Sequence, residues 1–226
     1  MANRIDLSQT VATLQKFCGT DLTHTLAELE TSVRGKDLNS YVQLITAGNA
    51  NSDVLAAASF MKHVAGQINV VIHALGILLC LPHLLEKDEK IEYVSLGAGN
   101  TGRAFDLETN KRIAEFKFIR WQGGPESIRQ NSIFKDFYLM AEDISTKHKY
   151  LYVLDTKHPL KFFNGGRALS SVLSRNVKLQ NDFKNRYGSR FRTVREYYDF
   201  RKGNVVLQDV AKLVPGLGEV SLDLEQ

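Results

Sequence analysis

The segment FDLETNKRIAEFK, which runs from Phe105 to Lys117, decides the fold of this chain. Apolar and polar residues alternate on both sides of Asn110-Lys111, which predicts two antiparallel strands joined by a two-residue turn. Asn suits such a turn because it tolerates the left-handed backbone conformation. One face of the predicted hairpin is apolar and is expected to pack under helices: Phe105, Leu107, Ala114, Phe116 and Phe118.

The register of this hairpin brings charged residues together. With the turn at residues 110–111, Thr109 lies opposite Arg112, and Asp106 lies opposite Glu115. Lys117 shares a face with Glu115, because side chains alternate with a period of two, and it lies diagonal to Asp106. A shift of one residue would move the whole apolar set to the other face, so the hydrophobic pattern supports this register independently.

The opposed carboxylates require a compensating positive charge, because like charges directly across a strand pair are destabilising. Lys117 supplies one such charge. Carboxylate oxygens on adjacent strands also suit a hard divalent cation, so we expect Asp106 and Glu115 to hold Mg²⁺ or Mn²⁺. Glu108 is a further candidate ligand on the same face. The spacing alone leaves a solvent-exposed charged cluster without a metal as the alternative.

Further elements are expected on both sides of the hairpin. Apolar residues at helical spacing predict helices over residues 5–35, 38–47 and 54–81. Strands are expected over 91–96, 103–108, 112–121, 149–154 and 193–200, and helices after GGPES at 123–127 and over 167–187. This order predicts an α/β domain that combines an antiparallel meander with a crossover helix.

The glycines of Gly97-Ala-Gly99-Asn-Thr-Gly102 fit the G-x-G-x-x-G pattern of a dinucleotide-binding turn. Such a turn must open a helix, because the pyrophosphate binds at the helix N-terminus. Here the residues that follow, RAFDLET, alternate as a strand does. We therefore interpret the segment as a loop between two strands, and a nucleotide-dependent oxidoreductase is the less favoured hypothesis.

The segment Val64–Leu81 approaches the length of a transmembrane helix. It contains Gln67, Asn69 and His73, which would be costly in hydrocarbon. We therefore expect a helix buried within the domain and no membrane association. In this interpretation His73 is a hydrogen-bonded core histidine rather than a ligand.

The composition is ordinary for a soluble globular protein, with 43% apolar and 24% charged residues. Two cysteines without a C-x-x-C motif argue against a disulfide framework, a zinc knuckle or an iron–sulfur cluster. The N-terminal MANRIDLSQT has no apolar signal region. The expected location is the cytoplasm.

Positive charge is concentrated in one part of the chain. Residues 157–202 contain twelve lysines and arginines against three acidic residues, a local balance of +9. This imbalance predicts a polyanionic partner, with nucleic acid as the first candidate, although a solvated basic helix face is about as common. Arg167, Arg175 and Lys178 are the expected phosphate contacts.

Asp106 in one predicted strand and Glu115-Phe116-Lys117 in the next resemble the motif of the PD-(D/E)XK, or restriction-endonuclease-like, nuclease superfamily. The resemblance covers about residues 54–200, and Phe105 stands where the family often has proline. It implies an α-β-β-β-α-β core with a mixed sheet flanked by helices. It also implies that Asp106 and Glu115 bind metal and that Lys117 is the catalytic lysine.

Some branches of that superfamily add a glutamine on the following helix, in a Q-x-x-x-Y motif. Gln130 matches the glutamine and is the expected catalytic residue, but Phe134 stands at the tyrosine position. Gln122 is a second candidate. The first helix of the fold often supplies an acid, whereas the 54–81 helix has none and offers Gln67 or Asn69 instead.

The expected protein is thus a Mg²⁺-dependent endonuclease or exonuclease that acts on DNA, in defence, restriction or repair. A non-catalytic module that binds nucleic acid or protein on the same fold is the alternative. Residues 1–50 are expected to form a helical extension, 51–205 the nuclease-like domain and 206–226 a C-terminal tail. Many members of the superfamily act as dimers, so a homodimer is one expected arrangement.

Overall fold

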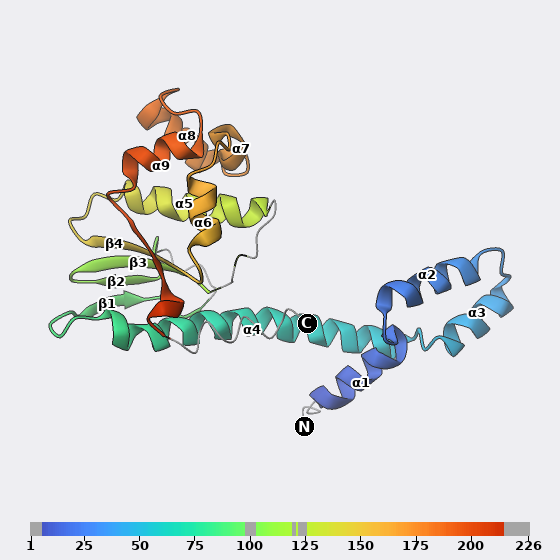
Figure 1. Ribbon diagram of the computed structural model, residues 1–226. Coiled ribbons are helices and arrows are strands. Elements are labelled where there is room, and N and C mark those ends of the chain that lie inside the picture. The colour runs from blue at the N-terminus through green and yellow to red at the C-terminus, as the bar shows by residue number, and fades with distance from the viewer. Residues whose placement is uncertain (1–5, 98–102, 119–120, 122–125, 215–226) are drawn as a thin grey trace. The chain divides into compact units, whose positions relative to one another are not determined.

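The computed structural model describes residues 6–97, 103–118, 121 and 126–214 (Figure 1). The chain forms two compact units, residues 1–69 and 70–226. The first contains α1 (Leu7–Cys18), α2 (Leu22–Val33), α3 (Leu38–Ala47) and the beginning of α4 (Ser52–Leu84). The single helix expected over 5–35 is therefore two helices.

Local capping explains this division. Gly19 ends α1 with a φ of 61°, which favours glycine because it lacks a Cβ. The carboxylate of Asp21 then accepts a hydrogen bond from the backbone N–H of His24 and begins α2. Asp6 and Asp37 cap α1 and α3 in the same way. An aspartate that satisfies a free N–H group is a strong helix start.

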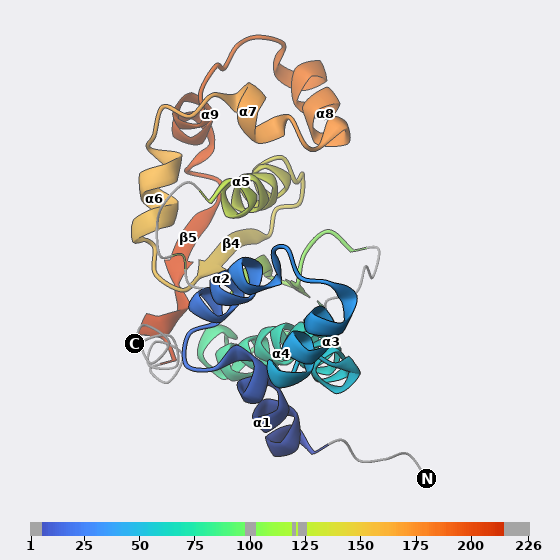
Figure 2. The same ribbon diagram turned by 90° about the vertical axis from the view of Figure 1, so that its right-hand side faces the viewer.

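The second unit is built on a mixed five-stranded sheet within the described residues. Its strands lie in the order β1 (Ile91–Val94), β2 (Leu107–Thr109), β3 (Arg112–Lys117), β4 (His148–Val153) and β5 (Val206–Asp209). The first three strands are antiparallel, whereas β3, β4 and β5 are parallel, and Figure 2 shows β5 beside β4. Helices cover both faces of the sheet, so the protein belongs to the α/β class.

The predicted register of the central hairpin is confirmed, since Leu107 pairs with Ala114 and β2 pairs with β3 around the turn at 110–111. The hydroxyl of Thr109 accepts hydrogen bonds from the backbone N–H groups of Lys111, at 3.0 Å, and of Arg112, at 2.8 Å. These hydrogen bonds stabilise the turn, in which lysine is an unfavourable second residue.

A buried ion pair anchors the same end of the hairpin. The guanidinium of Arg112 donates to both carboxylate oxygens of Glu89, with N–O distances of 2.5 and 2.6 Å. Thr109 donates its hydroxyl hydrogen to Glu89 as well. Burial by itself raises the pKa of Glu89, but the hydrogen bonds from Arg112 and Thr109 outweigh it and hold the pKa below its usual value.

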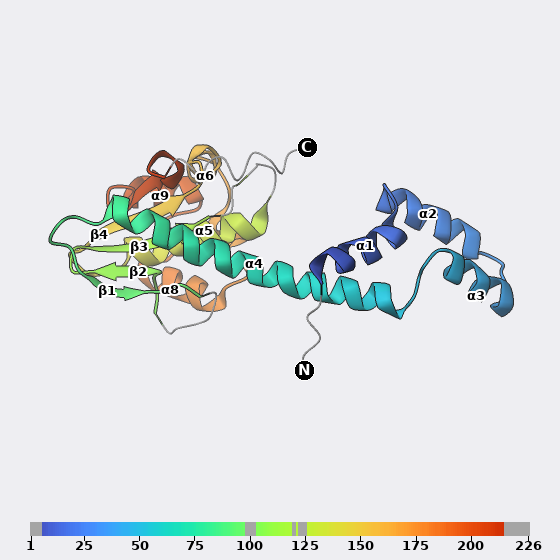
Figure 3. The same ribbon diagram turned by 90° about the horizontal axis from the view of Figure 1, so that it is seen from below.

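The two faces of the sheet carry separate cores. On one face, the last turns of α4 contribute Ile77, Cys80 and Leu81 to a cluster with Leu107 and Phe116 (Figure 3). Ala114 and Phe118 belong to this cluster too, as the hairpin pattern predicts. The remaining residue of the predicted apolar face does not, because Phe105 packs into the cluster on the opposite face. It lies before β2, where regular alternation has not begun.

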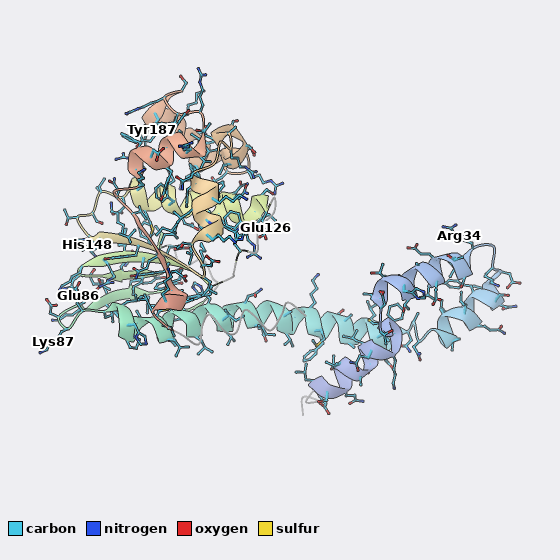
Figure 4. The ribbon with its side chains drawn as sticks, in the orientation of Figure 1. Arg34, Glu86, Lys87, Glu126, His148 and Tyr187 are labelled. Atoms are coloured by element: carbon cyan, nitrogen blue, oxygen red, sulfur yellow. The ribbon has the colours of Figure 1, made fainter. Side chains whose placement is uncertain are left out.

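The opposite face is covered by helices that connect the parallel strands. These are α5 (Ser127–Ala141), α6 (Lys157–Phe163), α7 (Leu169–Leu173), α8 (Val177–Tyr187) and α9 (Val194–Arg201), and η1 (Val210–Lys212) follows β5. Figure 4 shows Glu126 immediately before α5 and Tyr187 at the end of α8. The helix expected over 167–187 is thus divided into α7 and α8.

Two expectations for the C-terminal region are wrong. Residues 193–200 were expected to be a strand, but they belong to α9, which begins at a capping box formed by Thr193 and Glu196. The fifth strand is Val206–Asp209 instead, at positions where we expected a C-terminal tail. It pairs in parallel with β4.

Among the described residues, α4 is the one helix long and apolar enough to cross a membrane, judged by length and composition alone. A core helix of a soluble protein passes the same test. The expectation of a helix buried within the domain is wrong, because only 22% of its most apolar stretch is buried. Ile77 and Leu81 face the sheet, whereas Leu75 and Leu79 are each 52% exposed.

Candidate active site

Asp106 lies immediately before β2, and two elements hold its carboxylate. One oxygen, Oδ2, accepts a hydrogen bond from the backbone N–H of Phe116 at 3.0 Å. The other, Oδ1, lies 3.4 Å from Nε2 of His73 on α4. The backbone carbonyl of Asp106 accepts from the N–H of Ser95 at 2.7 Å. The described β2–β3 pairing ends at Leu107 and Ala114, one residue short of Asp106 and Glu115, so the pairing of those two residues stays a prediction.

Glu115 and Lys117 lie on the same face of β3 and are in contact. Nζ of Lys117 donates to Oε1 of Glu115 at 2.7 Å. The same ammonium lies 2.8 Å from Oδ2 of Asp136, a residue of α5. Lys117 therefore sits between one carboxylate of the strand and one of the helix that covers this face. The sequence reasoning did not single out Asp136.

Burial and neighbouring charges shift the pKa values of Glu115 and Lys117. Burial raises the pKa of Glu115 to about 7, and the charges of Asp136 and Asp106 act in the same direction against the opposing effect of Lys117. Burial alone would lower the pKa of Lys117. The carboxylates of Asp136 and Glu115 outweigh that effect and raise it above its usual value.

His73 is a member of this group that the sequence reasoning placed in the core. Its side chain is 23% exposed, and its Nε2 lies 3.4 Å from Oδ1 of Asp106. The hydrogen bond with Asp106 raises the pKa of His73, although burial opposes the shift. The ring also lies edge-on to Phe118, with centroids 6.1 Å apart. The expected hydrogen bond of His73 is therefore present, and its partner is the carboxylate of Asp106.

The donors at the hairpin fit one type of metal site. Among the described residues, no three His, Cys, Asp or Glu side chains are grouped so that they could hold a metal ion. The charge of Asp106 nevertheless acts on Glu115, whose pKa it helps to raise, and His73 lies against Asp106. Mg²⁺ commonly takes one or two protein carboxylates and fills its other positions with waters and substrate phosphates. Two carboxylates therefore fit Mg²⁺ that binds together with a phosphate, rather than in a cage of protein ligands.

Gln130, the expected catalytic glutamine, lies on α5, and its side-chain oxygen accepts a hydrogen bond from the guanidinium of Arg167. Arg167 also contacts the hydroxyl of Ser171 at 3.4 Å. The structure thus pairs one predicted catalytic residue with one predicted phosphate-binding residue. Arg175 and Lys178 are exposed on the segment that leads from α7 into α8.

Other candidates from the sequence occupy different positions. Glu108 lies in β2 and pairs with Arg103 at 3.5 Å. Gln67 contacts His63, one turn before it on α4, and Asn69 is exposed. Gln122 lies outside the described residues, as do residues 98–102 of the glycine-rich segment.

Comparison with known proteins found no matching family model, no matching curated protein and no matching solved structure. The α/β architecture with a mixed sheet stands on the structure itself. The relationship to the PD-(D/E)XK superfamily stays a prediction from the motif.

Proposed function

We propose that this protein is a metal-dependent nuclease that hydrolyses phosphodiester bonds, with DNA as its first candidate substrate. The observation that carries the proposal is the arrangement of Asp106, Glu115 and Lys117 on one hairpin. The β1–β2–β3 meander, the crossover helix α5 and the parallel strand β4 are compatible with a restriction-endonuclease-like core. Defence, restriction and repair are the processes that such an activity would serve.

In this proposal Asp106 and Glu115 hold Mg²⁺ or Mn²⁺, and His73 supports Asp106 from α4. The hydrogen bond from the N–H of Phe116 fixes one oxygen of Asp106 and thereby orients the carboxylate. A bound divalent cation would supply Lewis-acid polarisation of a phosphoryl oxygen. By orienting Asp106, His73 would raise the affinity of the site for the metal, because partners of a metal ligand commonly tune that affinity.

Lys117 supplies positive charge beside the scissile phosphate. Its ammonium is held by carboxylates that favour the charged form, so it suits stabilisation of negative charge that develops on the phosphate. It can also orient an attacking water molecule by donating a hydrogen bond. The attraction between a fixed cation and a developing negative charge is stronger in a partly desolvated site than in water.

The basic segment of residues 157–202 supports a nucleic-acid substrate. Arg175 and Lys178 are exposed, and residues 157–202 carry a charge balance of +9 from twelve basic and three acidic residues. Contacts of such side chains with phosphates would make binding weaken as salt concentration rises. Arg167, held by Gln130, is the phosphate contact expected nearest to α5.

The experiment is incubation of the protein with supercoiled DNA, linear DNA, single-stranded DNA and RNA, each with Mg²⁺, Mn²⁺ or EDTA. The proposal predicts cleavage that requires the metal and that is lost in Asp106→Asn and Glu115→Gln. Both variants keep the size of the side chain, so circular dichroism should show an unchanged fold. Salt-sensitive binding without cleavage of any substrate would contradict the nuclease and favour the non-catalytic binding module.

A further inference from the structure

Asp136 is a buried carboxylate whose contacts with the hairpin the proposed function does not use. Its side chain is 9% exposed, and it lies in the middle of α5, among the buried residues Phe134, Phe137 and Tyr138. Oδ2 lies 2.8 Å from Nζ of Lys117 and accepts a hydrogen bond from the hydroxyl of Ser132 at 3.4 Å. A buried carboxylate is costly unless it is paired, and here its partner is the lysine of the site.

Lys117 has two anionic neighbours, Glu115 and Asp136, and the proposed function gives them different roles. Glu115 Oε1 lies 2.7 Å from the ammonium, but Glu115 is also a proposed metal ligand. A divalent cation and an ammonium compete for the same carboxylate oxygens, because both are attracted by the same charge. Metal binding would therefore weaken the hold of Glu115 on Lys117. Asp136 approaches the ammonium from another element, α5, and the proposed function assigns it no metal.

We propose that Asp136 is a positioning residue that keeps the Lys117 ammonium directed into the site while Glu115 holds the metal. This inference rests on the proposed nuclease function. Lysine is a compact charge on a flexible four-carbon stem, so its place must be set by a partner. The helix α5 supplies that partner from a rigid, well-packed position, because Phe134 is completely buried and Phe137 nearly so.

The competing role for Asp136 is purely structural, as the ion pair that fastens α5 to β3. The two roles make different predictions. A structural ion pair affects stability and the amount of folded protein, whereas a positioning contact affects the turnover of the folded enzyme. The kinetic constants of the folded protein therefore separate them.

The kinetic test compares Asp136→Asn, Asp136→Ala and Asp136→Glu in full-length protein. The amide of Asp136→Asn can still accept a hydrogen bond but carries no charge. We expect kcat to fall by roughly 10–100-fold in Asp136→Asn and Asp136→Ala, since small misplacements at a reacting centre have effects of this size. KM for DNA and the half-saturating Mg²⁺ concentration should not change, and Asp136→Glu should recover part of kcat.

Asp88→Asn is the matched control. Asp88 forms an ion pair with Lys111 at 2.6 Å, but it is exposed and lies outside the proposed site and outside the basic segment. Its kcat should equal that of the wild type. A wild-type kcat in folded Asp136→Asn, or a change confined to KM or to metal affinity, would overturn the inference. A wild type that cleaves no substrate would overturn the proposed function and this inference with it, so the two failures are distinguishable.

A spectroscopic measurement tests the same role of Asp136 if the variants differ from the wild type in stability. Lysine labelled at Cε and Nζ gives an NMR signal for Lys117 that reports how tightly the ammonium is held. In the presence of Mg²⁺, we expect the signal to be that of an immobilised side chain in the wild type and of a mobile one in Asp136→Asn. A signal that is mobile in both proteins, or immobilised in both, would contradict the positioning role.

Discussion

The Asp106 carboxylate is held by groups that are distant in sequence, the N–H of Phe116 and the imidazole of His73. We predict that His73→Ala raises the Mg²⁺ concentration for half-maximal cleavage by about 10–100-fold, the usual effect of removing a partner of a metal ligand. A metal titration of cleavage measures this. His83→Ala, an exposed position on the same helix, is the control and should leave the titration unchanged. Equal titrations for His73→Ala and the wild type would contradict a role for His73.

The ion pair between Glu89 and Arg112 gives a second prediction for a single residue. Glu89→Gln leaves the Arg112 charge buried without its partner, so we expect a loss of roughly 3–5 kcal/mol in the free energy of unfolding. Because the pKa of Glu89 is lowered by folding, its stabilising effect is present above the usual pKa and is lost as pH falls through the folded value. Chemical denaturation at several pH values should show a smaller loss of stability in acid for the variant than for the wild type. An equally steep acid loss in both proteins would exclude Glu89 as its source.

The sequence was sufficient for some of these residues and not for others. The pairing of β2 with β3 follows from a local pattern, in which a turn and a two-residue period set the register, and Asp106 comes to lie against the backbone N–H of Phe116. His73 and Asp136 reach the site through tertiary contacts from helices, and no spacing rule connects them to the hairpin. Each is one of several polar residues in its own helix, and the sequence pattern does not distinguish it from the others. Their roles therefore emerge only from the packing of α4 and α5 on the sheet.

The packing of α4 on β3 depends on a close approach at Gly76. A methyl group added there would lie 2.7 Å from ring carbons of Phe118, which is fixed by its stacking with Phe116. We therefore predict that Gly76→Ala lowers the free energy of unfolding by about 1–3 kcal/mol, as overpacking does, although alanine is the better helix former.

Gly66→Ala is the matched control within the same helix. Among the described residues, no atom lies within 4 Å of the position that its methyl group would occupy. This substitution should raise stability by about 0.4–1 kcal/mol. Thermal unfolding of both variants provides the measurement. A stabilised Gly76→Ala protein would show that α4 does not approach β3 as closely as the structure has it.

At the level of elements, the sequence predicted the meander, the crossover helix and β4, because each has clear periodicity. It failed at 193–200, where Tyr197 and Tyr198 among polar residues resemble a strand. The decisive signal was Thr193-x-x-Glu196, a capping box that starts a helix. The short strand β5 was missed because four residues provide too little periodicity to identify.

Across the whole molecule, the two compact units differ in how much side chain they bury. In α1, α2 and α3 the described residues include one buried side chain, Thr10, whereas β3 and β4 are lined by completely buried residues such as Ala114 and Leu151. Local opening requires less free energy where fewer apolar contacts are lost. We predict that amide hydrogens of α1–α3 exchange much faster than those of β3 and β4. Hydrogen exchange followed by mass spectrometry tests this, and equal protection would contradict it.

The most direct test of the central claim is the rate of Mg²⁺-dependent DNA cleavage by Lys117→Ala, compared with the wild type and with Lys111→Ala. Lys111 lies on the same hairpin but pairs with Glu86 and Asp88 at the opposite end, so its loss should leave cleavage intact. We predict that folded Lys117→Ala binds DNA as the wild type does and cleaves it at least about 100-fold more slowly, as expected when a charge-stabilising group is removed. Cleavage by Lys117→Ala at the wild-type rate would contradict the assignment of this hairpin as the active site.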